Sequence, residues 1–367
     1  MATIRSFVRR EPVLLIAALA ALASCFFVPP DGSYWGYIDF RTLALLYCLM
    51  TVIAGLRGAG LFASMAHVLC VRAASVRSMG TLLVLMSFVS SMLITNDVAL
   101  LTFVPFTVVV LGMAGHQREL ILVVVLQTVA ANLGSMLTPV GNPQNLYLYS
   151  SYGLRFGAFL KVTFPIWALS LLLILAACLL LPKDGLDAFL GEEPQIDKRR
   201  LWLYAALFAV CLLVVLRVCD WPVMLAAVVL VLLVFDRGML LKADFMLLLT
   251  FVAFFVFAGN LARVEAVDTL LRRLIAGHEL LSGILTSQVI SNVPAALLLS
   301  GFTDQADALI LGVNIGGLGT PIASLASLIS MKLYSHAEHA RAGRYLAVFL
   351  IVNLVLLLIL YAAATLF

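Results

Sequence analysis

Residues 279–302 read ELLSGILTSQVISNVPAALLLSGF, an apolar stretch interrupted at its middle by Ser291, Asn292 and Pro294. Each apolar arm has roughly ten residues, and at about 1.5 Å rise per residue it reaches only about 15 Å, half of the roughly 30 Å hydrocarbon core of a bilayer. Neither arm can cross alone. The stretch therefore predicts a helical hairpin that enters a membrane from one face, turns at mid-depth and leaves by the same face.

The composition also places most of the chain in a lipid bilayer. The 367 residues are 63% hydrophobic and 11% charged, whereas a soluble domain carries about 25% charged residues. The six cysteines occur singly in apolar runs, which predicts neither a disulfide framework nor a transition-metal site. The net charge of +4 comes from short connectors and is a topology signal, so we expect no nucleic-acid partner.

Hydropathy predicts an all-α integral membrane protein with about nine transmembrane helices and two re-entrant hairpins. The expected crossing segments are 13–28, 40–56, 119–149, 162–182, 201–217, 221–235, 243–260, 306–333 and 345–366, of which 119–149 and 306–333 are broken by Pro and Gly. The hairpins are 279–302 and 78–112, and the arms of the second are long enough to be two crossings instead.

The distribution of positive charge predicts the orientation. With a cytoplasmic N-terminus, the inside connectors hold most of the 23 Lys and Arg residues, as expected in a plasma (inner) membrane. The C-terminus then lies outside. Arg9-Arg10 and the segment ending Leu22-Ala23-Ser24-Cys25 also resemble a cleavable signal, so retention of the first helix is left open.

Three sequence pairs indicate an internal repeat. Ala54-Gly55 matches Ala258-Gly259, Thr95-Asn96 matches Ser291-Asn292, and the eight residues 132–139 match 314–321. The equivalent segments 40–56 and 243–260 are the second and the seventh predicted crossings, and because these positions differ by an odd number the two copies must have inverted topology. The predicted organisation is 1–182 for the first repeat with its N-terminal helix, 183–217 for a linker and connecting helix, and 218–367 for the second repeat.

The hairpin tips and helix breaks are candidate binding sites, because interrupted backbone at mid-membrane frees carbonyl groups for cations and N–H groups for anions. The candidates are Thr95, Asn96, Asp97, Thr138, Pro139, Gly141, Asn142 and Pro143 in the first repeat, and Ser291, Asn292, Pro294, Thr320, Pro321 and Ser324 in the second. Helix capping and simple proline kinks are the alternatives. Asn132, Gly134, Asn314 and Gly316 either support the site or allow close helix packing.

Asp97 is the single acidic residue in the apolar stretch 78–115. An ionisable group at membrane depth is costly, which makes it a candidate cation ligand or proton carrier. A role in stabilising the start of its helix is the alternative. No Lys or Arg lies in either tip or either break, so a bound anion would depend on helix N-termini and co-bound cations.

At these residues the sequence resembles the ion transporter superfamily, which groups divalent anion/sodium symporters, citrate carriers, arsenite permeases and D-type sodium/proton antiporters. The motifs are ITNDVALLTFVPF (94–106), GSMLTPVGNPQNL (134–146), ISNVPAALLLS (290–300) and GVNIGGLGTPIASLASL (312–328). Asn96-Asp97 and TPIASLASL are similar to the arsenite permease branch, and GNPQNL to the citrate branch. The resemblance implies a cation site at each tip with its neighbouring break, a substrate between the two, alternating access and a homodimer.

We therefore expect a secondary active transporter in a lipid bilayer that moves a small anion or oxyacid coupled to Na⁺ or H⁺. A sodium/proton antiporter and an arsenite-type efflux permease are the alternatives. The sequence has no HExxH or GxSxG signature, so we expect neither an enzyme nor a cofactor other than the coupling ion.

Overall fold

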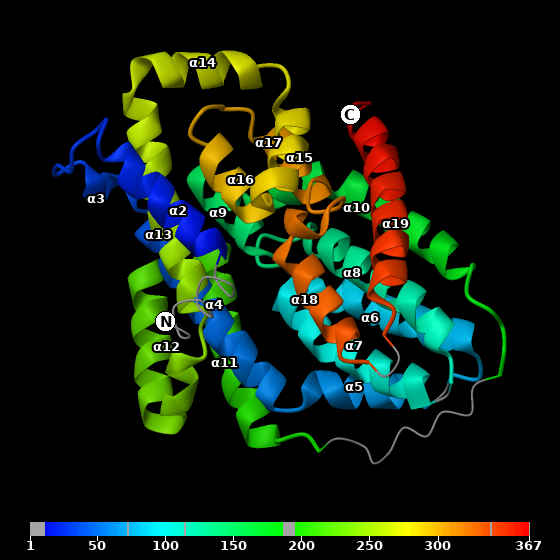
Figure 1. Cartoon of the computed structure of the whole chain (residues 1–367). Coiled ribbons are helices and arrows are strands. Elements are labelled where there is room, and N and C mark those ends of the chain that lie inside the picture. The colour runs from blue at the N-terminus through cyan, green and yellow to red at the C-terminus, as the bar shows by residue number, and fades with distance from the viewer. Residues whose placement is uncertain (1–11, 72, 114, 186–194, 338–339, 367) are drawn as a thin grey trace, which may run out of the picture.

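The computed structural model describes residues 12–71, 73–113, 115–185, 195–337 and 340–366, and Figure 1 shows the whole chain. Regular structure in these ranges is helical, and the only β-type pairing in them is an isolated bridge between Ser75 and Gly185. The prediction of an all-α protein is confirmed. Residues 1–11, which precede the first expected helix, and 186–194, within the predicted linker, lie outside the described residues.

The helices have the lengths and composition of a multi-pass membrane protein. Six are long and apolar enough to cross a bilayer: α4 (Phe40–Gly58), α6 (Val76–Ile94), α8 (Gln117–Ser135), α10 (Phe156–Cys178), α13 (Phe245–Arg263) and α19 (Ala342–Ala364). Shorter apolar helices are α2 (Pro12–Ser24), α7 (Asn96–Met113), α12 (Trp221–Phe235), α15 (Glu279–Ile290) and α17 (Ala306–Ile315). The others are α3 (Tyr34–Tyr37), α5 (Leu61–Cys70), α9 (Pro143–Ser151), α11 (Lys198–Val215), α14 (Glu265–Ile275), α16 (Asn292–Leu299) and α18 (Leu325–Ser335), with 3-10 turns η1 (Arg237–Leu241) and η2 (Pro321–Ala323). The count of nine crossings stays a prediction.

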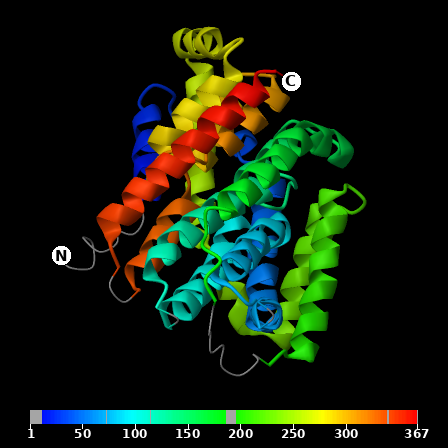
Figure 2. The same cartoon turned by 90° about the vertical axis from the view of Figure 1, so that its right-hand side faces the viewer.

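The peripheral helices expose apolar side chains. Figures 1 and 2 show α11 and α12 along one side of the molecule and α19 on the opposite side. Large exposed apolar residues on α10, α12 and α19 include Leu172, Leu230, Val234, Ile351 and Leu358. A surface this apolar suits hydrocarbon and not water.

Two helical hairpins turn without any connecting loop. Thr95 is the single residue between α6 and α7, and Ser291 is the single residue between α15 and α16. Their backbone angles are nearly identical, with φ 70° and ψ 151° at Thr95 and φ 76° and ψ 154° at Ser291. The two sequence motifs therefore make the same turn.

Two helices are interrupted where Pro and Gly gather. The first helix stops at Ser135 and resumes as α9, and the second stops at Ile315 and resumes as α18 after η2. Pro143 lies at the first position of α9, where its missing N–H leaves no hydrogen bond unmade. Gly319 has φ 103°, a conformation open to glycine and strained for other residues.

Matched contacts recur in the two halves of the chain. Asp39 and Asp244 cap α4 and α13 with similar backbone angles, each accepting from the N–H three residues ahead at 3.0 and 2.9 Å. A Cβ added at Gly134 would lie 2.7 Å from Ser91 Oγ, and one added at Gly316 would lie 2.8 Å from Ser287 Oγ. Both glycines thus allow a broken helix to press against a hairpin arm.

The short helices α5 and α14 lie at opposite ends of the molecule, α5 along the lower edge and α14 across the top in Figure 1. Each follows the helix that precedes a hairpin, because α5 lies between α4 and α6 and α14 between α13 and α15. This placement favours the predicted inverted repeat.

Two apolar clusters form the core. One joins α4, α9, α11, α12, α13 and α16, and the other joins α6, α8, α10 and α19. The hairpin tips and helix breaks bring buried polar side chains between these clusters.

Candidate functional site

The first tip is bound to the first broken helix. Asn96, at the start of α7, donates from Nδ2 to Asn132 Oδ1 at 2.9 Å, and its backbone N–H donates to the Gly141 carbonyl at 3.2 Å. The Thr138 hydroxyl donates to the Met92 carbonyl in the preceding arm. These bonds fix the tip against both flanks of the break.

The second tip is bound to the second break in a similar way. The Ser291 hydroxyl donates to the Ala323 carbonyl at 3.4 Å. Gln288 Nε2 donates to the carbonyls of Gly316 and Leu318 at 2.8 and 2.9 Å, and Gln288 Oε1 accepts from the Thr320 N–H at 2.8 Å. The sequence analysis did not include Gln288, although it is the long polar side chain nearest the tip in an apolar arm.

Asn132 links the two halves of the chain. Its Oδ1 accepts from Asn96 in the N-terminal half of the chain and from Ser324 Oγ in the C-terminal half, the latter at 3.0 Å. Its Nδ2 donates to the Gly317 carbonyl at 3.4 Å. Asn132 is buried, so each of these bonds forms where water does not compete.

Asn314 makes the reciprocal link. Its Oδ1 accepts from Asn142 Nδ2 at 3.2 Å, and its Nδ2 donates to Asn145 Oδ1 at 2.6 Å. Asn142 also caps α9, since its Oδ1 accepts from the Asn145 N–H at 2.9 Å. Asn145 was missing from the sequence-based candidates, and its position three residues after the Asn142 cap is the signal that could have identified it.

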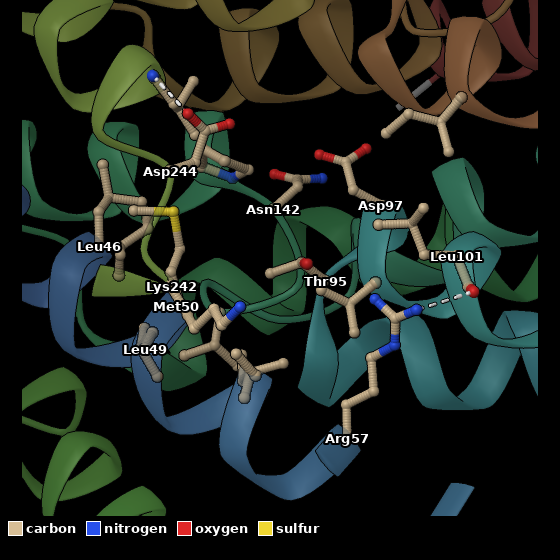
Figure 3. A pocket seen from close by; sticks show the side chains of 18 of the residues that line it. Leu46, Leu49, Met50, Arg57, Thr95, Asp97, Leu101, Asn142, Lys242 and Asp244 are labelled. Atoms are coloured by element: carbon tan, nitrogen blue, oxygen red, sulfur yellow. Dashed lines mark hydrogen bonds between the residues drawn. The ribbon is translucent and has the colours of Figure 1, made fainter. Parts of the chain in front are cut away.

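A cavity of about 520 Å³ ends at the first tip (Figure 3). Thr95, Asp97, Asn142 and Pro143 line its polar part. Its apolar walls come mainly from α4 and α7, and the charged side chains Arg57, Lys242 and Asp244 also face it. A second space, of about 10 Å³, shares Asp97 and Pro143 with this cavity and is further lined by Asn96, Asn292 and Ser324. The two tips therefore meet at the polar end of the cavity.

Asp97 has a distinct environment. It lies in the first turn of α7, and its backbone N–H donates to Asn96 Oδ1 at 3.0 Å. Within the described part of the chain, its carboxylate has no hydrogen-bond or ion-pair partner. Figure 3 shows Asp97 and Asp244 pointing into the same cavity from different walls, with Asn142 between them.

The remaining candidates shape the backbone and do not line these two spaces. Thr138, Pro139, Gly141, Ser291, Pro294, Thr320 and Pro321 belong to this group. Gly141 lies so close to Ser135 that an added Cβ would be 2.1 Å from the Ser135 carbonyl oxygen. Pro294 lies in the first turn of α16, where a missing N–H costs little. Among the described residues, no group of three His, Cys, Asp or Glu side chains could hold a metal ion.

Interrupted helices around a buried polar centre, in a multi-pass apolar protein, define a secondary transporter. The chain belongs to the citrate transporter family (CitMHS), whose match covers residues 1–307. This membership confirms the resemblance to the ion transporter superfamily and makes the chain a transporter and not an enzyme.

The names of similar proteins agree with assignment of the chain to a family of membrane transporters. The chain is 30% identical to the inner membrane protein YbiR of Escherichia coli, over 86% of each chain. It is 31% identical to an uncharacterized transporter of Methanocaldococcus jannaschii, over 90% of each chain. It is also 28% identical to the silicon efflux transporter LSI3 of Oryza sativa, over 40% of this chain and 30% of the relative.

Proposed function

We propose that the chain moves a small anion or oxyacid across the inner membrane, coupled to Na⁺ or H⁺, by alternating access of two inverted repeats in a homodimer. The substrate would occupy the end of the 520 Å³ cavity next to the tips, where Asn142 and Asp97 line it. The space of about 10 Å³ between Asn96, Asn292 and Ser324 has room for no more than about one water. Amide and hydroxyl groups can donate to an oxyacid, and the breaks supply carbonyl groups for a cation.

The observation that carries this proposal is the position of Asp97. Its carboxylate ends the cavity at the point where both tips meet and has no partner within the described residues. Asp97 is half-buried and faces the cavity, and an unpaired carboxylate at membrane depth is stabilised by a proton or a metal cation. Asp97 is therefore the proposed coupling site.

The same carboxylate narrows the substrate class. A polyanion next to Asp97 would be repelled, and no Lys or Arg lines the small space between the tips. Arg57 and Lys242 line the larger cavity, where they can attract an anion before it reaches the tips. We therefore favour a neutral or singly charged oxyacid. The rice relative is named as a silicon efflux transporter.

The second candidate function is sodium/proton antiport. Efflux of an arsenite-type acid is one version of the first candidate, the transport of a small anion or oxyacid. Antiport is favoured by one specific observation, the pair of carboxylates Asp97 and Asp244 on facing walls of one cavity. Two carboxylates in one site can hold a proton or a sodium ion in exchange.

Electrical recordings from proteoliposomes distinguish these candidates. We would apply jumps of citrate, silicic acid and arsenite in sodium or choline, without a pH gradient, to wild type, Asp97→Asn and the control Asp307→Asn. Asp307 is an exposed acidic residue outside both spaces. A substrate-dependent current that is lost only in Asp97→Asn supports coupled transport. Antiport is tested by a second recording with a sodium jump, an imposed pH gradient and no substrate, in which wild type and Asp307→Asn should give a current that Asp97→Asn lacks. Unchanged current in Asp97→Asn would remove Asp97 from the mechanism.

Binding of the coupling ion has its own measurement. A ligand at about one hundred times its Kd stabilises the native state by about 2.7 kcal/mol. Thermal unfolding in sodium and in choline should therefore differ for wild type, and the difference should shrink in Asn96→Ala. The coupling ion is the proton if two results are found together. The unfolding curves in sodium and in choline coincide, and pH shifts the unfolding curve of wild type but not that of Asp97→Asn.

A further inference from the structure

A cavity of about 350 Å³ lies away from the transport site, where α8 begins and α18 approaches α19. Three arginines, Arg118, Arg341 and Arg344, line it together with Tyr334. Among the described residues, none of the three guanidinium groups has a hydrogen-bond or ion-pair partner. Glu119, the acidic residue in the lining, instead lies 3.6 Å from His116.

Unpaired arginines that share one cavity repel one another, and an anion between them removes that cost. The cavity also contains the N-terminal turns of α8 and α19, whose free N–H groups add a smaller attraction for negative charge. Its wall is rigid. The Arg341 N–H donates to Tyr334 Oη at 3.0 Å, and the Tyr334 and Tyr345 rings stack with centroids 4.6 Å apart.

A second space of about 330 Å³ continues from the first and shares Arg118, Arg344, Ile121 and the carboxylate residue Glu119 with it. Its other lining residues are mostly apolar and come from three helices or their ends: Leu122 from α8, Leu180, Leu181 and Pro182 after α10, and Val348 from α19. Leu180 is 75% exposed. A basic cavity that leads into an apolar groove matches a molecule with an anionic head and a hydrocarbon tail.

The location agrees with a membrane surface. From the distribution of positive charge we expect Arg118, Arg341 and Arg344, which lie at the N-terminal ends of α8 and α19, on the inside. Figure 1 shows α18 in the lower half of the molecule, on the same side as α5. Anionic phospholipids are abundant in the inner leaflet, and basic pockets between transmembrane helices bind their headgroups.

We propose that these two spaces bind one anionic phospholipid, with its phosphodiester between Arg118, Arg341 and Arg344 and an acyl chain along Leu122, Leu180 and Val348. Free inorganic phosphate shares the headgroup chemistry but has no part that fills the apolar groove. The lipid would tie α8, α10 and α19 together at the membrane surface.

Native mass spectrometry of the full chain in detergent tests this proposal, with phosphatidylglycerol and phosphatidylcholine as probes. The test variant is Arg118→Gln/Arg344→Gln. The control is Lys198→Gln/Arg199→Gln, which removes two exposed charges from the predicted inside face without touching either space. We expect wild type and control to bind phosphatidylglycerol in preference to phosphatidylcholine, and the test variant to bind it about 10-fold or more weakly.

Thermal unfolding provides the second readout. Phosphatidylglycerol should raise the Tm of wild type and control by about 2–4 °C. Inorganic phosphate at about 10 mM, on the order of a weak Kd, should not raise it. Retention of the lipid shift in the test variant, an equal loss in the control, or an equal shift with inorganic phosphate would each overturn the lipid site. Because neither readout uses transport, the result is independent of the proposed function.

Discussion

Thr95 and Ser291 place the two hairpin turns in a conformation that side chains other than glycine rarely adopt. Their φ values of 70° and 76° combine with ψ near 150°, a region that costs about 1–3 kcal/mol for a residue with a Cβ. The surrounding hydrogen bonds hold each residue there, since the following asparagine or the serine itself is bonded to the neighbouring break. The surrounding contacts therefore hold each turn in one conformation, and the strain of that conformation lowers the free energy of unfolding of the protein.

Replacement of these residues by glycine should separate stability from transport. We expect Thr95→Gly and Ser291→Gly to keep or raise the free energy of unfolding, because relief of about 1–3 kcal/mol of strain exceeds the roughly 0.5–1 kcal/mol entropic cost of glycine. Transport should fall, because the tip no longer holds a single conformation. Thermal unfolding and flux measure the two effects. Ser90→Gly, inside α6, is the control and should be destabilised; equal destabilisation of Thr95→Gly would contradict the strain.

The Asn132 amide is a second residue whose effect can be isolated. Asn132→Ala removes two acceptor contacts and one donor contact, and each buried group left unpaired costs about 1–3 kcal/mol. We expect a large loss of thermal stability together with loss of transport. Asn353→Leu is the control, because the buried Asn353 Oδ1 has no partner among the described residues and its Nδ2 donates only to the Phe349 carbonyl of its own helix there. That change should be neutral or stabilising. Similar losses in both variants would argue against a special role for the Asn132 network.

At the scale of elements, the two arms of the first hairpin differ in how their backbone is satisfied. Pro105 lies inside α7 and has no N–H, so the Leu101 carbonyl lacks its partner four residues ahead. Arg57, at the end of α4, donates from Nη2 to this carbonyl at 3.2 Å. A cationic side chain in the cavity wall therefore replaces a missing helix bond and connects α4 to the hairpin.

A double-mutant cycle tests this replacement. Arg57→Gln should lower the free energy of unfolding by about 0.5–1.5 kcal/mol, the net value of one hydrogen bond. In a Pro105→Ala background the residue 105 N–H can bond to Leu101, so the same Arg57→Gln change should cost much less. Thermal or chemical unfolding of the four proteins gives the coupling energy. Additive effects would mean that Arg57 does not compensate for Pro105.

The loop between α2 and α3 is held to the end of α13 by an ion pair with a defined pH dependence. Asp31 lies 2.9 Å from Arg263, and hydrogen bonding to Arg263, then to Ser33, lowers the pKa of Asp31 to about 2. A lowered folded-state pKa gives stability that is present above the unfolded value of about 3.9 and is lost as the pH falls through about 2. The Tm difference between wild type and Asp31→Asn should be constant above pH 5 and shrink below pH 4. The Tm difference between wild type and Arg263→Gln should show the same dependence on pH. If the Tm difference instead varied between pH 6 and 8, another titrating group would be responsible for it.

The sequence predicted the elements better than their contacts. The hairpin turns and helix breaks were predictable, because short apolar arms, Pro and Gly indicate where a helix must end. The turns are at 95–96 and 291–292, and the breaks are at 138–143 and 319–324. Gln288 and Arg57 were not predictable, because each donates to a backbone carbonyl 28 or 44 residues away and nothing in its local spacing marks that partner. Asn145 could have been found from its position three residues after the Asn142 cap. The matched caps Asp39 and Asp244 also went unnoticed, since two residues are too short a match to find without geometry.

At the scale of the molecule, the two ends of the transport site differ in the structure described. The end that contains Arg57 and Lys242 holds the cavity. Away from that cavity, Tyr147 packs its ring 5.6 Å from Phe255 and shares a hydrogen bond of 2.8 Å with Ser300, and Tyr152 donates to the Thr303 carbonyl at 2.9 Å. These contacts join α9 to the end of the second hairpin. Under the proposed alternating access of two repeats, the end with the cavity would be the open side and the end with these contacts the closed side.

Equivalent leucines in the two hairpins make this asymmetry measurable. Leu101 lines the cavity, and Leu297, at the equivalent position after the second tip, is 2% exposed. In a background without the six natural cysteines, Leu101→Cys should react with a membrane-impermeant maleimide and Leu297→Cys should be protected. Tyr147→Phe/Tyr152→Phe removes the two hydroxyl contacts that close the second hairpin, so it should raise labelling of Leu297→Cys and lower that of Leu101→Cys. Opposite changes follow only if the two sides exchange as one equilibrium, because a population gained by one form is lost by the other. If both labelling rates rose together, the hydroxyl contacts would stabilise local packing, and alternating access of the repeats would lose its structural basis here.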